Sequence, residues 1–186
     1  MAEMKGDPAE ASRAVLAFWF AEVGKERWWV RDAELDAAIA ARFGALREAV
    51  LKSRGEGWRD DPATLLAAII LCDQFSRNIF RGGRKAFEAD ALARELTKLA
   101  LERGWDGGMS PDRRQFLLMP LQHSENLADQ ERSLAEFAAL GDQQAARYAQ
   151  LHHDQIARFG RFPGRNAALG RRTSEEEQAV IEEGVF

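Results

Sequence analysis

Cysteine and histidine are scarce in this chain, and their scarcity excludes several kinds of site. Cys72 is the one cysteine, so no intramolecular disulfide can form, which is typical of a protein kept in a reducing compartment. The three histidines occur without an HExxH sequence, a Glu-x-x-His pair or paired cysteines, and there is no phosphate-binding glycine motif. We therefore expect neither a metal nor another cofactor.

Long apolar runs and an excess of positive charge are also missing. The longest apolar stretch, residues 65–72, is far shorter than the ~20 residues that a transmembrane helix needs. The first residues contain no apolar core of signal-peptide length. The net charge of −4 disfavours broad binding to nucleic acid. We expect a cytoplasmic protein with no membrane partner and no nucleic-acid partner.

No segment alternates apolar and polar residues as a β-strand would, whereas apolar residues recur at helical spacing along the whole chain. Asp7, Asp32 and Asp61 stand where helix-capping residues are expected, and residues 173–176 (TSEE) predict a capping box before a short last helix. The pattern predicts an all-α protein of about seven to eight antiparallel helices. We expect a single domain over residues 1–186, with its core over about 7–184.

Two arginine-rich segments are the strongest candidates for a binding site. In residues 73–81 (DQFSRNIFR), Asp73, Arg77 and Arg81 are spaced i, i+4, i+8, which predicts one charged row on a helix. Residues 158–166 (RFGRFPGRN) interleave three arginines with two phenylalanines. Guanidinium groups suit carboxylates and phosphates, so we expect an arginine-lined pocket for an anionic small molecule or peptide. Its predicted ligand-binding residues are Asp73, Arg77, Arg81, His152, Arg161, Arg165 and Asn166.

A simpler interpretation of the same arginines is an internal network of ion pairs. Asp73 or Glu125 would then neutralise them and hold the C-terminal loop in place. One acid cannot neutralise four bases, so the sequence leaves both interpretations open.

The histidines offer an enzymatic alternative. His123 is expected to share a helix face with Leu127 and Leu134, and His152 to share one with Ile156. Such a histidine is usually a hydrogen-bonded core residue, but a buried imidazole can also act as a general acid or base. A metal-independent hydrolase or lyase would use His123 or Glu125 in that role, with the arginines stabilising negative charge. Whether the protein is an enzyme stays open.

A third hypothesis is a protein-interaction scaffold, with a homodimer as one form. It predicts an exposed apolar patch, at Trp28 and Trp29 or at the terminal Val185 and Phe186. The simpler interpretation of the tryptophans is that they cover the ends of the helix bundle.

Four segments together resemble a known family. They are LAFWF (residues 16–20), DQFSRNIFR (73–81), PLQHSENLADQERS (120–133) and RFGRFPGRN (158–166), and they place the chain close to the bacterial family named domain of unknown function 924. The resemblance implies a tetratricopeptide-like helical array and no established activity or catalytic residue. The family usually has a histidine where this chain has Gly164. An obligate catalytic role for that histidine would leave this chain inactive, whereas a binding role tolerates the change.

Overall fold

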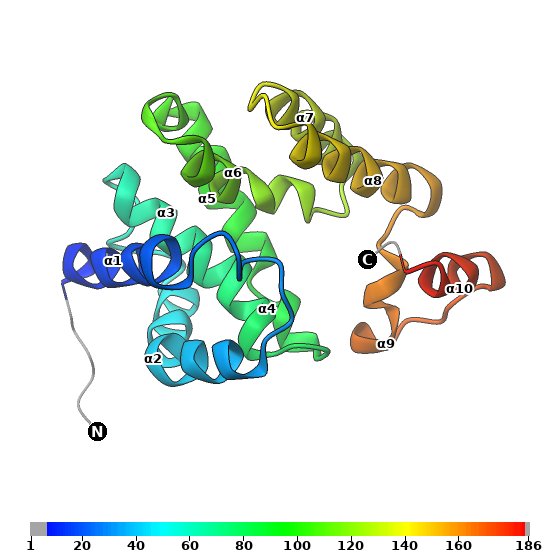
Figure 1. The fold of residues 1–186 in the computed structure, drawn as a ribbon, viewed down its shortest axis with the longest axis horizontal. Coiled ribbons are helices and arrows are strands. Elements are labelled where there is room, and N and C mark those ends of the chain that lie inside the picture. Colours follow the sequence, from blue (N-terminus) through cyan, green and yellow to red (C-terminus); the bar gives the residue numbers. More distant parts are fainter. Residues whose placement is uncertain (1–6, 185–186) are drawn as a thin grey trace. The chain divides into compact units, whose positions relative to one another are not determined.

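The computed structural model describes residues 7–184, and the chain divides into two compact units. Unit 1 contains the residues up to Arg81 together with Lys85–Met109, and unit 2 contains Gly82–Arg84 and the residues from Ser110 onward. Within residues 7–184 the elements are helical and no strand occurs (Figure 1), so the all-α prediction is confirmed and the expected number of helices is close. The single domain and the tetratricopeptide-like stacking remain predictions.

Unit 1 is built from helices whose starts follow from local capping. The side chains of Asp7, Asp32 and Asp61 each accept a hydrogen bond from a backbone N–H in the first turn of the helix that follows, as the sequence predicts. The α-helices of this unit are α1 (Pro8–Ala17), α2 (Ala33–Lys52), α3 (Pro62–Ile70), α4 (Ser76–Ile79) and α5 (Asp90–Glu102). Shorter turns are η1 (Phe18–Val23), η2 (Leu71–Phe75), η3 (Arg84–Phe87, which begins in unit 2) and η4 (Trp105–Gly108).

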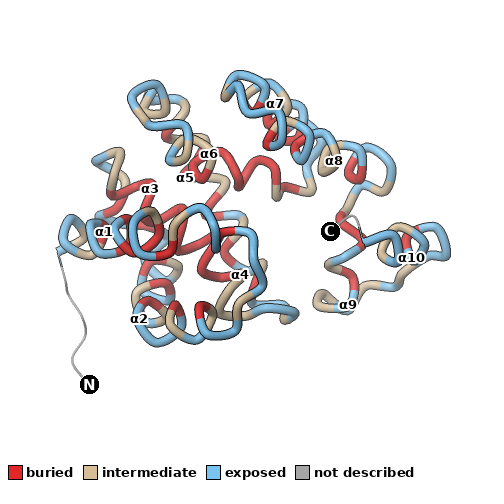
Figure 2. Tube along the Cα trace, in the orientation of Figure 1, coloured by how far each residue is buried: buried red, intermediate tan, exposed pale blue. Residues whose placement is uncertain are grey.

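The centre of unit 1 is the continuous helix α3–η2–α4, which is buried from Thr64 to Ser76 (Figure 2). The segment η2 is a π-helical turn, so its winding is wider than that of the α-helix on either side. Helix α4 ends at Ile79, and Arg81 lies beyond it. The predicted row of Asp73, Arg77 and Arg81 is therefore wrong at its last member, because the helix does not continue to that residue.

Unit 2 contains three longer helices followed by short ones. They are α6 (Pro111–Gln122), α7 (Leu127–Ala138), α8 (Gln143–Phe159), the 3₁₀ turn η5 (Pro163–Arg165), α9 (Asn166–Leu169) and α10 (Glu175–Glu182). Helices α7 and α8 pack side by side (Figure 1), and their short connection makes them an antiparallel hairpin. The sequence predicts a kink or restart at Pro120. Helix α6 continues two residues past it, and the new helix begins only at Leu127, where the side chain of Asn126 caps it.

The side chain of Gln130 joins the end of α6 to α7. Gln130 is fully buried, and its Nε2 donates to the carbonyl oxygens of Gln122 (2.7 Å) and Ser124 (2.6 Å). The last carbonyls of a helix have no donor within that helix. Gln130 supplies the missing donor, which fixes the corner between α6 and α7.

The predicted position of the capping box before the last helix needs correction. The capping box before α10 uses Ser174 and Glu177, one residue later than the predicted box over 173–176.

Across residues 7–184 we find no helix with the length and apolar character needed to cross a membrane.

Candidate functional site

The predicted site residues fall into two sets, one in each unit. Asp73, Arg77 and Arg81 lie in unit 1, whereas His123, Glu125, His152, Arg161, Arg165 and Asn166 lie in unit 2. Each set is described by itself, and the convergence of both sets on one pocket stays a prediction.

In unit 1, Arg77 bridges two carboxylates. Its Nη1 lies 3.0 Å from an oxygen of Asp73, and both terminal nitrogens donate to the carboxylate of Asp90, at 3.0 and 3.1 Å. Asp73 is almost completely buried and also accepts a hydrogen bond from Gln74. Burial lowers the pKa of Arg77, but the charges of Asp73 and Asp90 outweigh it, so the pKa is raised overall. The pairing of Asp73 with an arginine that the simpler interpretation predicts is present.

Arg81 pairs with an acid from a different helix. Its Nε and Nη2 donate to the carboxylate of Asp36 in α2 at 2.7 and 2.8 Å, and Asn78 donates to the same carboxylate at 2.8 Å. Burial raises the pKa of Asp36, but the bonds from Arg81 and Asn78 more than offset it, so the pKa lies below its ordinary value. Both predicted arginines of unit 1 thus hold a protein carboxylate where a ligand carboxylate would otherwise sit.

Unit 2 brings the two histidines together. His123 terminates α6, and its carbonyl oxygen accepts a hydrogen bond from Arg165 at 2.8 Å. The rings of His123 and His152 lie 5.9 Å apart between centroids, and the His152 ring meets Phe162 edge-on at 5.5 Å. The predicted helix face shared by His123 and Leu127 is wrong, because these residues belong to different structural elements and Leu127 is 44% exposed.

Glu125 anchors the segment that follows α8. It accepts hydrogen bonds from the Phe162 backbone (2.9 Å) and from both terminal nitrogens of Arg171 (2.9 and 2.8 Å). Burial raises the pKa of Glu125, but these bonds lower the pKa by more than burial raises it. The net pKa lies below its ordinary value, so Glu125 stays ionised near neutral pH. An ionised, fully engaged carboxylate is a poor general acid. Sequence reasoning missed Arg171, although it follows Gly170 directly and forms half of an Arg-Arg pair.

A second carboxylate in unit 2 is held still more tightly. Glu177 of α10 accepts from Arg161 Nε (2.6 Å) and Nη2 (2.9 Å), from the Ser174 backbone (2.8 Å) and from Asn166 Nδ2 (3.3 Å). We call Arg161, Asn166 and the Ser174 N–H the carboxylate grip. The bonds from Arg161, and next the one from Ser174, lower the pKa of Glu177 from 4.5 to about 2. Sequence analysis predicted Arg161 and Asn166 as carboxylate binders but did not find Glu177.

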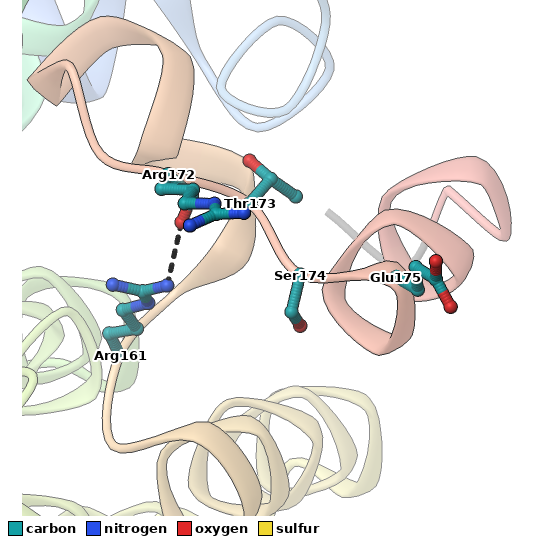
Figure 3. A pocket seen from close by; sticks show the side chains of 5 residues that line it. All are labelled: Arg161, Arg172, Thr173, Ser174 and Glu175. Atoms are coloured by element: carbon teal, nitrogen blue, oxygen red, sulfur yellow. Dashed lines mark hydrogen bonds between the residues drawn. The ribbon is translucent and has the colours of Figure 1, made fainter.

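Beside the grip lies an open hollow of about 400 Å³, lined by Arg161, Arg172, Thr173, Ser174 and Glu175 (Figure 3). Arg161 Nη2 crosses to the Arg172 carbonyl oxygen at 2.9 Å. No other described residue pairs with the Arg172 side chain, and none accepts a hydrogen bond from Arg161 Nη1. The hollow therefore borders guanidinium donors that the described part of the chain leaves available.

The remaining chemically reactive groups form no site of their own. Burial raises the pKa of Cys72 to about 12, so its thiol is not a nucleophile near neutral pH. Among residues 7–184, no cluster of three or more His, Cys, Asp or Glu side chains could hold a metal ion. Trp28 is buried and stacks on Trp19, whereas Trp29 and Val30 are more than half exposed. Val185 and Phe186, the other predicted apolar patch, lie outside the described residues.

The chain is similar to proteins whose activity is not established. The family described as bacterial protein of unknown function (DUF924) matches residues 15–185. A solved structure of a protein of unknown function from Agrobacterium tumefaciens is 36% identical, with a TM-score of 0.90 over 96% of this chain and 100% of that one. No curated protein matches significantly.

Proposed function

The chain belongs to DUF924, a family of bacterial proteins of unknown function, and we propose that this member binds the carboxylate of a small molecule or peptide in the hollow of unit 2. The observation that carries the proposal is the Arg172 guanidinium, which lines the hollow and pairs with no side chain among residues 7–184. A planar guanidinium matches a carboxylate or phosphate with two parallel hydrogen bonds.

The other groups around the hollow are also mainly donors. The hydroxyl of Thr173 already accepts a bond from Asn166, and that of Ser174 accepts one from the Glu177 backbone. Each hydroxyl can still donate its own hydrogen to a ligand. Arg161 Nη1 is a further donor. Among the residues that line the hollow, Glu175 alone carries a carboxylate. Glu177 already balances the charge of Arg161, so what favours an anionic ligand is the set of available donors, led by the Arg172 guanidinium.

A thermal-shift screen with carboxylated and phosphorylated metabolites tests the proposal. A ligand at about 100 times its Kd should stabilise the wild type by about 2.7 kcal/mol. Arg172→Ala should abolish the shift, because the substitution removes a guanidinium that lines the hollow.

Arg147→Ala is the matched control. Arg147 is an exposed arginine of α8 that does not line the hollow, and its removal changes the net charge by the same amount. Equal shifts for the wild type and both variants would contradict binding at the hollow.

The enzymatic alternative is favoured by one contact. His152 Nδ1 lies 2.8 Å from the carbonyl oxygen of Tyr148 and 3.0 Å from Gln122 Nε2, and the tautomer that donates to Tyr148 has its proton-accepting lone pair on Nε2. A metal-independent hydrolase or lyase would therefore use His152 or His123 as its base rather than Glu125. Loss of turnover of a carboxylate ester in His152→Gln, with binding at the hollow retained, would support this alternative over binding alone.

A further inference from the structure

Helix α10 is docked by a charge rather than by an apolar face. Glu177 is its one buried residue, while Val180 and Ile181 are partly exposed and the others are exposed (Figure 2). In most surface helices a stripe of apolar side chains supplies the docking energy. Helix α10 lacks that stripe, so its position depends on the carboxylate grip.

Hydrogen bonds of Arg171 fix the chain just before this helix. Arg171 is held by both oxygens of Glu125, and its backbone N–H donates to the Asn166 carbonyl at 2.8 Å. Residues 171–174 then run to α10 without helical structure. A release of Glu177 would therefore free α10 and leave the preceding segment in place.

The grip and the hollow share Arg161. Three of its hydrogen bonds go to Glu177 and to the Arg172 carbonyl oxygen, while its Nη1 remains available at the hollow. A ligand carboxylate can bind Arg161 through two parallel hydrogen bonds only by displacing a partner of Nε or Nη2, because Nη1 is the one nitrogen without a partner among residues 7–184. The two carboxylates thus compete for one arginine.

We infer that Glu177 is a built-in competitor of the ligand, so that a carboxylate entering the hollow takes Arg161 from Glu177 and undocks α10. This inference rests on the proposed function. It gives the site two states, with Glu177 gripped and α10 docked, or with ligand bound and α10 released. A ligand shifts such an equilibrium by its differential affinity for the two states. The grip's full set of hydrogen bonds makes the docked state the resting one.

The test compares Glu177→Gln with Glu176→Gln by calorimetric titration with citrate. The two variants remove the same charge from neighbouring positions, but Glu176 is exposed and makes only a 3.8 Å contact with Arg158. Loss of the competitor in Glu177→Gln should strengthen citrate binding about tenfold, within the range usual for coupled sites. Glu176→Gln should bind as the wild type does.

Hydrogen exchange of the wild type gives a second readout that needs no substitution. Citrate should speed exchange of the α10 amides, residues 175–182, while α8 stays unchanged. Citrate binding with equal or lower affinity in Glu177→Gln, or binding that slows exchange in α10, would overturn this inference and leave the proposed function standing. No citrate binding by the wild type or by either variant would remove both.

Discussion

The interiors of the two units are stabilised in different ways. Unit 1 packs aromatic rings closely: Phe43 lies 5.1 Å from Phe18 and 5.2 Å from Phe75, and Trp19 lies 5.4 Å from Phe75. Unit 2 also buries apolar residues, but much of its interior is polar. Its buried polar residues are Gln122, Ser124, Asp129, Gln130, Ser133, Gln155, Asn166 and Glu177. Hydrogen bonds are directional, so unit 2 depends more on individual partners than unit 1 does.

The two arginine-rich segments show the same contrast. In unit 1 the acids take up the guanidinium groups of Arg77 and Arg81. In unit 2, Glu177 pairs with Arg161 but leaves Arg161 Nη1 without a partner among residues 7–184, and Arg172 keeps its donors at the hollow. The same chemistry is therefore structural in one unit and available to a ligand in the other. What separates the two roles is whether the partners of each guanidinium leave donors available at a hollow, which residue type alone does not reveal.

Removal of the buried acid of unit 1 should have the largest effect. Asp73→Asn leaves Arg77 with Asp90 as its remaining acidic partner in a largely buried site, so the free energy of unfolding should fall by about 3 kcal/mol. Urea unfolding followed by tryptophan fluorescence measures this, since all five tryptophans lie in unit 1. A loss below about 1 kcal/mol would show that the pair adds little net stability.

Loss of the polar corner in unit 2 should come second. Gln130→Leu leaves the carbonyls of Gln122 and Ser124 without their donor, at a cost of about 2 kcal/mol. Urea unfolding followed by far-ultraviolet circular dichroism gives the value, with the exposed Gln144→Leu as the control. Equal stability of the two variants would mean that apolar packing, rather than these hydrogen bonds, holds the corner.

The exposed pair of unit 1 should matter much less. Arg81 is 35% exposed, so Arg81→Ala should lower the free energy of unfolding by about 0.5 kcal/mol. The difference from the wild type should shrink further in about 1 M sodium chloride, because salt screens exposed charges. A loss of more than about 2 kcal/mol would show that the Arg81 pair behaves like a buried ion pair, and would weaken the contrast between exposed and buried pairs.

The smallest effect on the whole molecule is expected from acid at Glu177. Its pKa is lowered in the folded state, so its contribution to the docking of α10 is complete above about pH 4.5 and declines as the pH falls toward 2. Protection of the α10 amides, expressed relative to their intrinsic exchange rate at each pH, should therefore fall across this window in the wild type. The change should be smaller in Glu177→Gln, which lacks the gripped carboxylate but keeps the other glutamates of α10, and a parallel response of both proteins would argue against the grip.

Sequence analysis recovered the helices better than the site. Asp7, Asp32 and Asp61 were predicted correctly because capping involves residues only a few positions apart. Arg47 was missed. It is fully buried between Phe43 and Val50 on the inner face of α2, where its position in an apolar row was the available signal. The π-helical turn η2 and the early end of α4 were also missed, because no local pattern marked them.

The sequence by itself determined an all-α chain, most helix starts and the two segments in which arginines meet aromatic residues, because each depends on neighbours along the chain. The tertiary structure alone decided which acid each arginine holds. Asp36 and Arg81 are 45 residues apart, and Glu125 and Arg171 are 46 apart. An ion pair forms when packing brings charges within a few ångströms, and that distance is set by the whole unit rather than by the spacing of residues.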